Sequence, residues 1–167
     1  MLLTIWRHGQ AAAGDNDRLR ELTDVGRDDV GFGSQRLHVA CGTNGIKHPD
    51  HILYSPLVRT TQTARIIAAA FTHAPQAIEN ALQPGGDVGA VASAVQCLRD
   101  ASVGESHVLM VSHQPLISAL VDYYLGAGNS VPFLTPGAWV TMSFASPESS
   151  GGRLLFWALP PEFEVHA

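Results

Sequence analysis

Short apolar runs alternate along this chain with longer segments that open on helix-start signals. The apolar runs cover residues 2–7, 51–54 and 107–111, and each is followed by a polar or glycine-containing junction. Runs of this length and composition predict buried β-strands. Strand–helix alternation of this kind is typical of a mostly parallel sheet covered by helices.

The segments between the strands begin with residues that cap helices. Thr23 precedes a segment with acidic residues in its first turn, and Ser55 is followed by Pro56, which suits the first helical position. Asp87 begins a third segment of this type. The predicted helices run over residues 23–40, 55–71, 87–99 and 115–125.

The last third of the chain has a different pattern. Residues 138–144 and 153–158 predict two strands, and Pro147 and Gly151-Gly152 lie between them, which favours an antiparallel hairpin. The 167 residues fit one ordinary domain, and no linker, repeat or low-complexity tract divides them. We therefore expect a single α/β domain over residues 1–167, with a mostly parallel sheet and antiparallel C-terminal strands.

Composition narrows the class of protein. Apolar residues make up 46% and charged residues 15%, which is typical of a folded globular protein. The net charge of −5 disfavours nonspecific binding to nucleic acid or anionic membranes, so an anion site must be made locally. No segment approaches the ~20 apolar residues of a membrane span. Cys41 and Cys97 lack metal-site or disulfide-framework spacing, and we expect a cytoplasmic protein with free thiols.

Three strand-to-helix junctions carry the candidate chemistry. Arg7-His8-Gly9 closes the first strand, Arg59 lies one turn into the helix after the second, and His113 follows the third. In a parallel sheet all three junctions lie at the carboxyl edge, where open α/β sheets bind ligands. Helix N-termini at that edge also favour anions. The pattern therefore predicts that two arginines and two histidines converge on one pocket.

This residue set suits phosphoryl transfer. Arg7 and Arg59 offer planar charged forks that can bind phosphoryl oxygens, and His113 can donate to the same oxygens. His8 can attack phosphorus when its ring is neutral and its other nitrogen is held by an acceptor. Because these side chains supply the positive charge, the chemistry requires no metal ion or cofactor. Gly9 is expected to let the backbone approach the anion.

Each residue alone has a plainer interpretation. A histidine beside a strand is usually a core or surface residue, and an arginine in a first helical turn is usually solvated. The polar loop at residues 15–20 either is a solvated face, which we favour, or contacts a protein substrate. His48 and His51 are three apart, but Pro49 breaks a helical ligand pair, so we expect no metal site there. The recurrence at three equivalent junctions gives the candidate residues their weight.

The order of motifs resembles the histidine phosphatase, or phosphoglycerate-mutase-like, superfamily. The tripeptide Arg7-His8-Gly9 matches its RHG signature, and the resemblance extends to about residue 125. It implies a three-layer α/β/α sandwich with His8 as phospho-accepting nucleophile and Arg7, Arg59 and His113 completing the phosphate pocket. The remaining matching blocks are Leu22-Thr23 with Gly26, Ser55-Pro56-Leu57-Val58-Arg59 through Thr63, and Ser112-His113-Gln114-Pro115.

Within that superfamily the chain is similar to the small SixA-type protein histidine phosphatases. The segment Pro84–Gly89 resembles one typical of that branch, and large lid insertions are absent. The resemblance implies signal transduction through a histidine-phosphorylated partner, either a phosphotransfer domain or a phosphocarrier protein. The sequence names no partner and does not indicate an oligomeric state.

One departure from the superfamily pattern bears on the substrate. Many members place a Glu or Asp as general acid where this chain has Ala81 and Gln83, leaving Glu79 and Asp87 as weak candidates. An alkoxide leaving group needs such an acid, whereas imidazole leaves readily and takes a proton from solvent. We therefore expect a phosphohistidine phosphatase. Two alternatives stay open: a small-molecule phosphomonoesterase or mutase on the same scaffold, and a non-catalytic module that binds phosphorylated partners.

Overall fold

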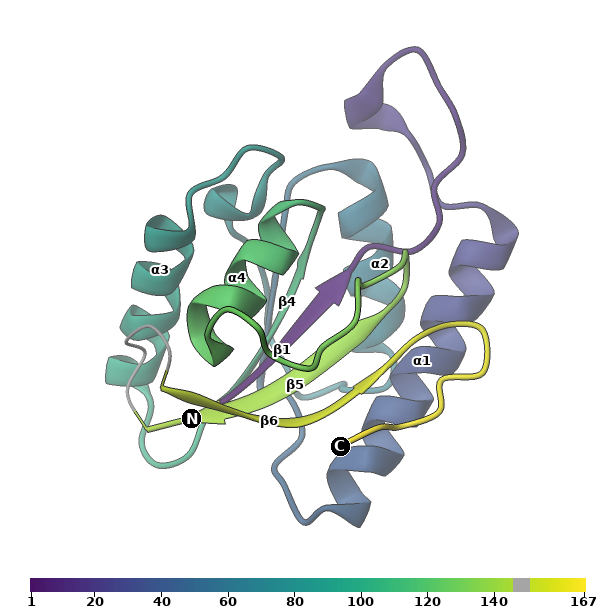
Figure 1. Ribbon diagram of the computed structural model, residues 1–167. Coiled ribbons are helices and arrows are strands. Elements are labelled where there is room, and N and C mark those ends of the chain that lie inside the picture. The colour runs from purple at the N-terminus through teal and green to yellow at the C-terminus, as the bar shows by residue number, and fades with distance from the viewer. Residues whose placement is uncertain (146–150) are drawn as a thin grey trace.

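The computed structural model describes residues 1–145 and 151–167, and its centre is one mixed β-sheet (Figure 1). The strand order is β3-β2-β4-β1-β5-β6. β1 pairs in parallel with β4, and β4 in parallel with β2, whereas β5 runs antiparallel to both β1 and β6. The predicted mostly parallel sheet with an antiparallel hairpin is confirmed. The strands are β1 (Leu2–Arg7), β2 (His51–Tyr54), β3 (Gln76–Ile78), β4 (His107–Ser112), β5 (Trp139–Phe144) and β6 (Gly152–Ala158).

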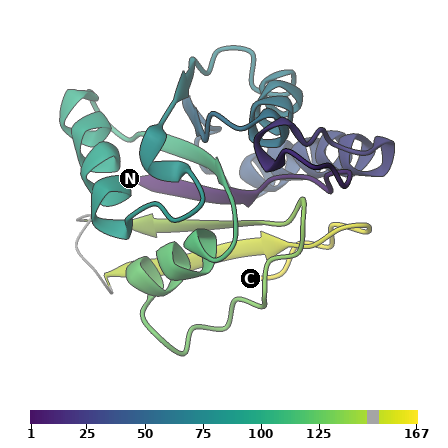
Figure 2. The same cartoon turned by 90° about the horizontal axis from the view of Figure 1, so that it is seen from above.

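Helices cover both faces of this sheet, which makes the three layers that Figures 1 and 2 show. Alternate residues of β1 enter two cores: Leu3 and Ile5 pack with α3 and α4, and Trp6 packs with α1 and α2. This alternation follows from the period of two in a strand. The helices are α1 (Asp24–Thr43), α2 (Val58–Ala68), α3 (Val88–Ala101) and α4 (Leu116–Leu125), with short 3-10 turns η1 (Asp17–Leu19) and η2 (Asn80–Leu82).

Two of the three predicted helix caps are confirmed. The Thr23 side chain accepts a hydrogen bond from the Gly26 amide, and the Asp87 carboxylate accepts one from Ala90. The prediction for Ser55 and Pro56 is wrong by about two residues, because α2 begins at Val58. The Ser55 hydroxyl instead pairs with His113, so its side chain does not cap the helix.

Other boundaries differ in ways that have physical reasons. α2 ends at Ala68, and turns rather than helix continue to Phe71. The sequence pattern did not indicate β3, because its three residues are exposed and pair only with β2 at the sheet edge. Pro147, which was expected in the turn of the C-terminal hairpin, lies outside the described residues. Within the described residues, no helix is long and apolar enough to cross a membrane.

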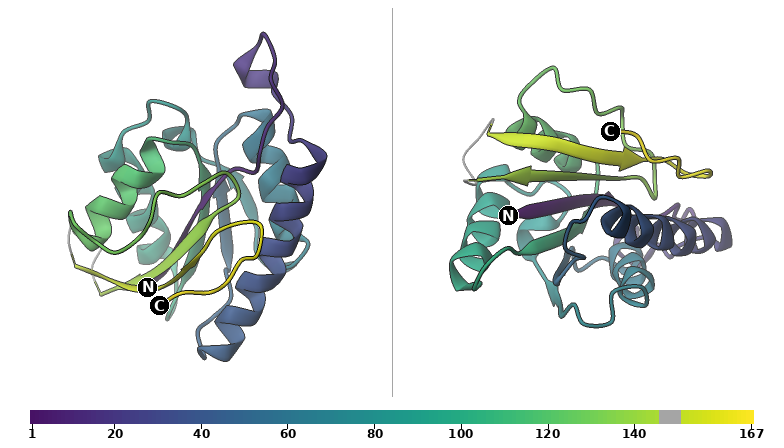
Figure 3. Two further views of the ribbon diagram at one scale, coloured as in Figure 1. Left: turned by 45° about the vertical axis from the view of Figure 1, so that its right-hand side comes forward. Right: turned by 90° about the horizontal axis from the view of Figure 1, so that it is seen from below.

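The topology brings the carboxyl ends of β1, β2 and β4 to one edge of the sheet. Arg7 is in register with Ser112, and Tyr54 with Val111, so the residues that follow these strands are neighbours. The segment after β1, which contains η1, extends beyond this edge and returns to the start of α1 (Figure 3, left). We refer to this side of the molecule as the carboxyl edge.

Candidate active site

The four predicted site residues lie at the carboxyl edge. Arg7 ends β1 and His8 follows it, His113 follows β4, and Arg59 lies in the first turn of α2. The ring centroids of His8 and His113 are 5.0 Å apart. Arg59 Nε lies 3.3 Å from His8 Nε2. The fold thus brings together residues that are up to 106 positions apart in the sequence, counted from Arg7 to His113.

The hydrogen bonds of His8 show which of its two ring nitrogens carries no proton. Its Nδ1 lies 2.8 Å from the carbonyl oxygen of Gly9. A carbonyl only accepts, so Nδ1 donates and holds the single hydrogen of the neutral ring. The lone pair is then on Nε2, which faces the Nε–H of Arg59 at 3.3 Å. This arrangement leaves a nucleophilic nitrogen beside a guanidinium group.

Both histidines of the site are neutral at pH 7. Burial, reinforced by Arg59, Arg7 and Arg20, lowers the pKa of His8 to about 4, although the Gly9 hydrogen bond works against the shift. Burial, the proximity of the His8 ring and the Arg59 charge lower the pKa of His113 to about 3. Both effects disfavour the charged ring. His8 therefore needs no deprotonation before it acts as a nucleophile.

Ser55 holds His113 in place. The Ser55 hydroxyl lies 2.9 Å from His113 Nε2, and both residues are buried. Nδ1 of His113 is also buried and has no hydrogen-bond partner among the described residues. A buried polar atom without a partner is costly, so this nitrogen marks a place where an added group would be stabilised.

The Arg7 side chain is fixed by the segment between α4 and β5. Its Nη1 donates to the carbonyl oxygen of Leu134 at 2.9 Å, and its guanidinium carbon lies 5.6 Å from the centroid of the Phe133 ring. Burial lowers the pKa of Arg7, which still leaves the group charged at pH 7. No carboxylate in residues 1–145 or 151–167 forms an ion pair with Arg7. Its charge is thus available to an anion.

Arg59 has a partner that sequence reasoning missed. Its guanidinium donates to the carbonyl oxygen of Asp17 at 2.6 Å and to the Asp17 carboxylate at 3.1 Å. Although partial desolvation acts in the other direction, hydrogen bonds from Arg59 and Arg20 lower the pKa of Asp17. Asp17 is exposed, as the solvated interpretation of residues 15–20 predicts, but its carboxylate also pairs with Arg59. A run of polar residues does not reveal that one of them contacts Arg59, which is 42 positions later in the sequence.

The structure shows a packing reason for glycine at position 9. A Cβ at this position would lie 2.7 Å from the carbonyl oxygen of Gly26 and 2.8 Å from a methyl group of Val30. Gly9 therefore lets β1 pack closely against α1. Its amide donates to the Thr63 hydroxyl of α2 at 3.1 Å, which ties the His8 segment to the helix that carries Arg59.

The two candidate acids are engaged elsewhere. The Glu79 carboxylate accepts a hydrogen bond from the Ala81 amide at 2.9 Å, and the Asp87 carboxylate caps α3. Both are hydrogen-bonded to the backbone of their own segment, which is a capping role. Among the described residues, the carboxylate that contacts one of the four candidate residues is that of Asp17, through Arg59.

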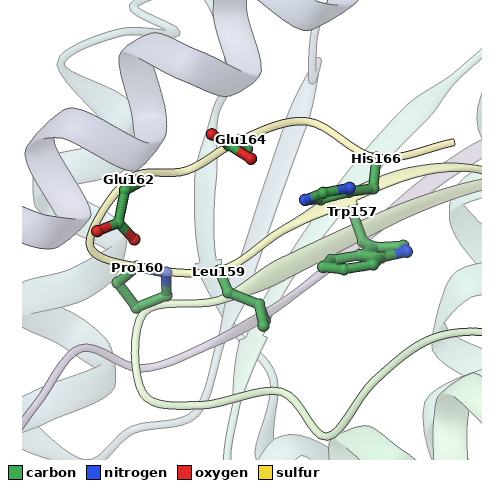
Figure 4. A pocket seen from close by; sticks show the side chains of 6 residues that line it. All are labelled: Trp157, Leu159, Pro160, Glu162, Glu164 and His166. Carbon is green, nitrogen blue, oxygen red and sulfur yellow. The ribbon is translucent and has the colours of Figure 1, made fainter.

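The other clusters of histidine and acidic residues do not contain the two arginines and two histidines of this site. His48 stacks on His38 with ring centroids 4.1 Å apart, and His51 pairs with Asp50. In the described part of the chain, no three His, Cys, Asp or Glu residues could together hold a metal ion. A pocket of about 340 Å³ under the C-terminal segment, where His166 stacks on Trp157, includes none of the four candidate residues (Figure 4).

Comparisons with known proteins identify relatives of this chain in sequence and in fold. The model of the histidine phosphatase superfamily (branch 1) matches residues 3–83. A phosphohistidine phosphatase SixA homolog of Haemophilus influenzae is 31% identical over 137 residues, which are 80% of this chain and 82% of that protein. The tungstate complex of the protein histidine phosphatase SixA superposes with a TM-score of 0.79 and 27% identity, over 98% of this chain and 100% of that one.

A further solved structure shares the fold. A mycobacterial glucosyl-3-phosphoglycerate phosphatase in complex with VO3 has a TM-score of 0.72 and 19% identity, over 95% of this chain and 99% of that one. The expected phosphoglycerate-mutase-like α/β/α architecture is thereby confirmed.

Proposed function

Because this chain belongs to the histidine phosphatase superfamily, which makes it a phosphatase-type hydrolase, we propose that it removes phosphate from phosphohistidine of a partner protein. The reaction passes through a covalent intermediate on His8 and uses no metal ion. The observation that carries this proposal is the unprotonated Nε2 of His8, which lies beside Arg59 while Nδ1 donates to the Gly9 carbonyl. The likeness to SixA-type phosphatases supports the choice of substrate.

In the first step the Nε2 lone pair of His8 attacks the phosphorus atom of the substrate phosphohistidine. A P–N bond forms to His8, and the P–N bond to the substrate imidazole breaks. The imidazole leaves with the electron pair and takes a proton from solvent. The Gly9 carbonyl, which accepts from Nδ1, stabilises the positive charge that develops on the His8 ring.

In the second step a water molecule attacks the phosphorus atom of phospho-His8. The P–Nε2 bond breaks, inorganic phosphate leaves, and His8 returns to its neutral form. Arg7 and Arg59 bind the phosphoryl oxygens in both steps, and His113 donates to them. The Arg59 guanidinium is hydrogen-bonded to Asp17, so the incoming phosphoryl group has to displace the Asp17 carboxylate.

The leaving group favours a phosphohistidine substrate over a phosphoester. Glu79 and Asp87 are engaged in capping, and the pKa of Asp17 is held low by its hydrogen bonds to Arg59 and Arg20, although partial desolvation acts against this. A carboxyl group that is ionised at neutral pH is a poor general acid. An imidazole does not depend on such an acid to leave, whereas an alkoxide does.

A second candidate function is the hydrolysis of a small phosphomonoester. It is favoured by the shared fold of the mycobacterial glucosyl-3-phosphoglycerate phosphatase. The general acid for this reaction would be the nearby carboxyl group of Asp17, which would have to leave Arg59 and take up a proton first. Of the two candidates, this one requires a general acid that the free protein does not hold ready.

The test compares phosphate release from a histidine-phosphorylated carrier protein with release from a panel of phosphomonoesters, without added metal. The variant is His8→Ala, and His73→Ala, which changes an exposed histidine after α2, is the matched control. We expect release from phosphohistidine by the wild type and by His73→Ala, and none above background by His8→Ala. Preferential turnover of a phosphomonoester would replace the first candidate with the second.

A further inference from the structure

Exposed apolar side chains gather around the candidate site. Among the described residues, eight large apolar side chains are exposed. Half of them lie at the carboxyl edge, in η1, at the start of α1, at the end of β3 and before β5. They are Leu19, Val25, Ile78 and Phe133, with exposed fractions of 63%, 59%, 56% and 66%. Clustering of this kind around one site is typical of an interaction surface, whereas single exposed apolar residues are ordinary.

Two of these side chains stand next to the candidate phosphate-binding arginines. Leu19 belongs to the same 3-10 turn as Asp17, which hydrogen-bonds Arg59. Phe133 lies over the guanidinium of Arg7. Each of the two arginines, Arg59 and Arg7, therefore has an exposed apolar side chain in a neighbouring segment.

Val25 extends this apolar surface into a hollow. A groove of about 370 Å³ is lined by the apolar side chains of Val25, Pro136, Pro160 and Pro161 and by the polar ones of Gln10, Asp29 and Thr135. Gln10 is two residues beyond His8. The groove is thus continuous with the segment that carries the candidate nucleophile. We call Leu19, Val25 and Phe133 the apolar rim.

We infer that the apolar rim docks a histidine-phosphorylated protein whose phosphohistidine is flanked by apolar side chains. This inference rests on the proposed function and adds the surface that recognises the protein around the phosphoryl group. Charge complementarity identifies the centre of the contact, because Arg7 has no carboxylate partner in the described residues and its charge is available to the phosphoryl group. A polar small molecule would leave the rim exposed, whereas an apolar protein surface would cover it.

The expected energetics give the rim a measurable role. Full burial of a Leu or Val side chain at a contact is worth about tenfold or more in affinity. In the described structure no side-chain hydrogen bond or ring contact joins Leu19 or Val25 to His8 or His113, so truncation of these two residues is expected to act on the protein part of the substrate. Discrimination between a phosphoprotein and a small phosphoramidate is therefore the property to measure.

The test uses Leu19→Ser, Val25→Ser and the double variant in the full-length chain. The two substrates are a histidine-phosphorylated carrier protein and free phosphohistidine. We expect kcat/KM for the phosphoprotein to fall about tenfold in each single variant and further in the double variant. For free phosphohistidine we expect a change below about twofold, because the phosphate contacts are intact.

The matched control is Val103→Ser. Val103 is fully exposed, and it precedes β4 at the opposite edge of the sheet. We expect wild-type rates with both substrates, and thermal melting of all variants verifies that they are folded. Equal losses on both substrates, or wild-type rates on the phosphoprotein, would overturn the docking inference alone. A wild-type protein without activity on the phosphoprotein would overturn the proposed function and the docking inference together.

Discussion

The two ends of β4 each hold a buried histidine, and the two differ in what their ring nitrogens contact. His107 begins the strand: its Nδ1 donates to the Lys47 carbonyl at 2.6 Å, and its Nε2 lies 2.8 Å from the Thr4 hydroxyl. His113 follows the strand, and its Nδ1 has no partner in the described structure. One histidine is satisfied by the protein, and the other is not.

The comparison shows that a shifted pKa does not by itself identify a functional histidine. Burial lowers the pKa of His107 to about 4 and that of His113 to about 3. What separates them is their surroundings, since His113 lies beside His8 and near two arginines, whereas His107 lies within the sheet. Desolvation acts at both ends, but only the carboxyl edge combines it with unpaired polar atoms and positive charge.

The largest expected effect contrasts these two histidines directly. We expect His113→Ala to lower kcat/KM for a phosphohistidine substrate by about 10²–10³-fold, as the loss of a transition-state hydrogen-bond donor does. We expect His107→Asn to change it less than about threefold per folded molecule, because the residue is remote from the candidate site. Single-turnover phosphate release measures both. Similar losses of kcat/KM in the two variants would contradict the assignment of His113, and not His107, to the candidate site.

For stability we expect the reverse order: His107→Asn should have the larger effect and His113→Ala the smaller one. His107→Asn should lower the free energy of unfolding by about 1–3 kcal/mol, because the buried Thr4 hydroxyl and the Lys47 carbonyl each lose a hydrogen bond. His113→Ala removes one buried hydrogen bond, to Ser55, and a ring whose Nδ1 is already unpaired in the described structure, so its effect should be smaller. Urea denaturation at pH 7 measures the two values, and a larger loss for His113→Ala would contradict the account.

Arg59 should affect anion binding next most strongly. We expect Arg59→Ala to weaken the binding of phosphate or vanadate by about 1.5–3 kcal/mol, the usual contribution of charge-assisted hydrogen bonds. Isothermal titration with vanadate measures this, and Arg36→Ala, which lies on α1 away from the candidate site, is the control. Unchanged affinity in Arg59→Ala would exclude the residue from the phosphate pocket.

Acidification should destabilise the protein in a defined pH window. His8, His107 and His113 have folded-state pKa values of about 4, 4 and 3, below the value of 6.5 expected after unfolding. Below pH 6.5 the unfolded chain therefore binds protons that the native protein does not, and stability falls until about pH 4 and below. We expect Tm to fall from pH 7 to pH 5, and more gently in His107→Asn. A Tm that is constant over this range would contradict the depressed pKa values.

The smallest expected effect concerns Asp17. Because its carboxylate competes with phosphate for Arg59, Asp17→Asn should raise phosphate affinity by about two- to fivefold, the modest scale of a solvent-exposed pair. Asp15→Asn, in the same loop, is the control. Phosphate titrations of both variants test this, and a loss of affinity in Asp17→Asn would indicate that Asp17 supports anion binding.

The sequence predicted most of the fold and the candidate residues for identifiable reasons. Apolar runs and caps are local signals, and parallel topology then places the ends of β1, β2 and β4 together. The exposed edge strand β3 gave no apolar pattern, and the Ser55 hydroxyl was assigned to a helix because its partner His113 is 58 positions away. Asp17 was missed for the same reason. Contacts that depend on tertiary structure have no local signal in a single sequence.

The central claim is that His8 carries the phosphoryl group, and a trapped intermediate tests it most directly. The protein is mixed with excess histidine-phosphorylated carrier protein, quenched in alkali within milliseconds, digested and analysed by mass spectrometry. The account predicts an acid-labile, base-stable phosphoryl group on His8 that forms faster than phosphate is released and is absent in His8→Ala. Phosphate release at the full rate without a phosphoenzyme, or with the phosphoryl group on His113, would contradict it.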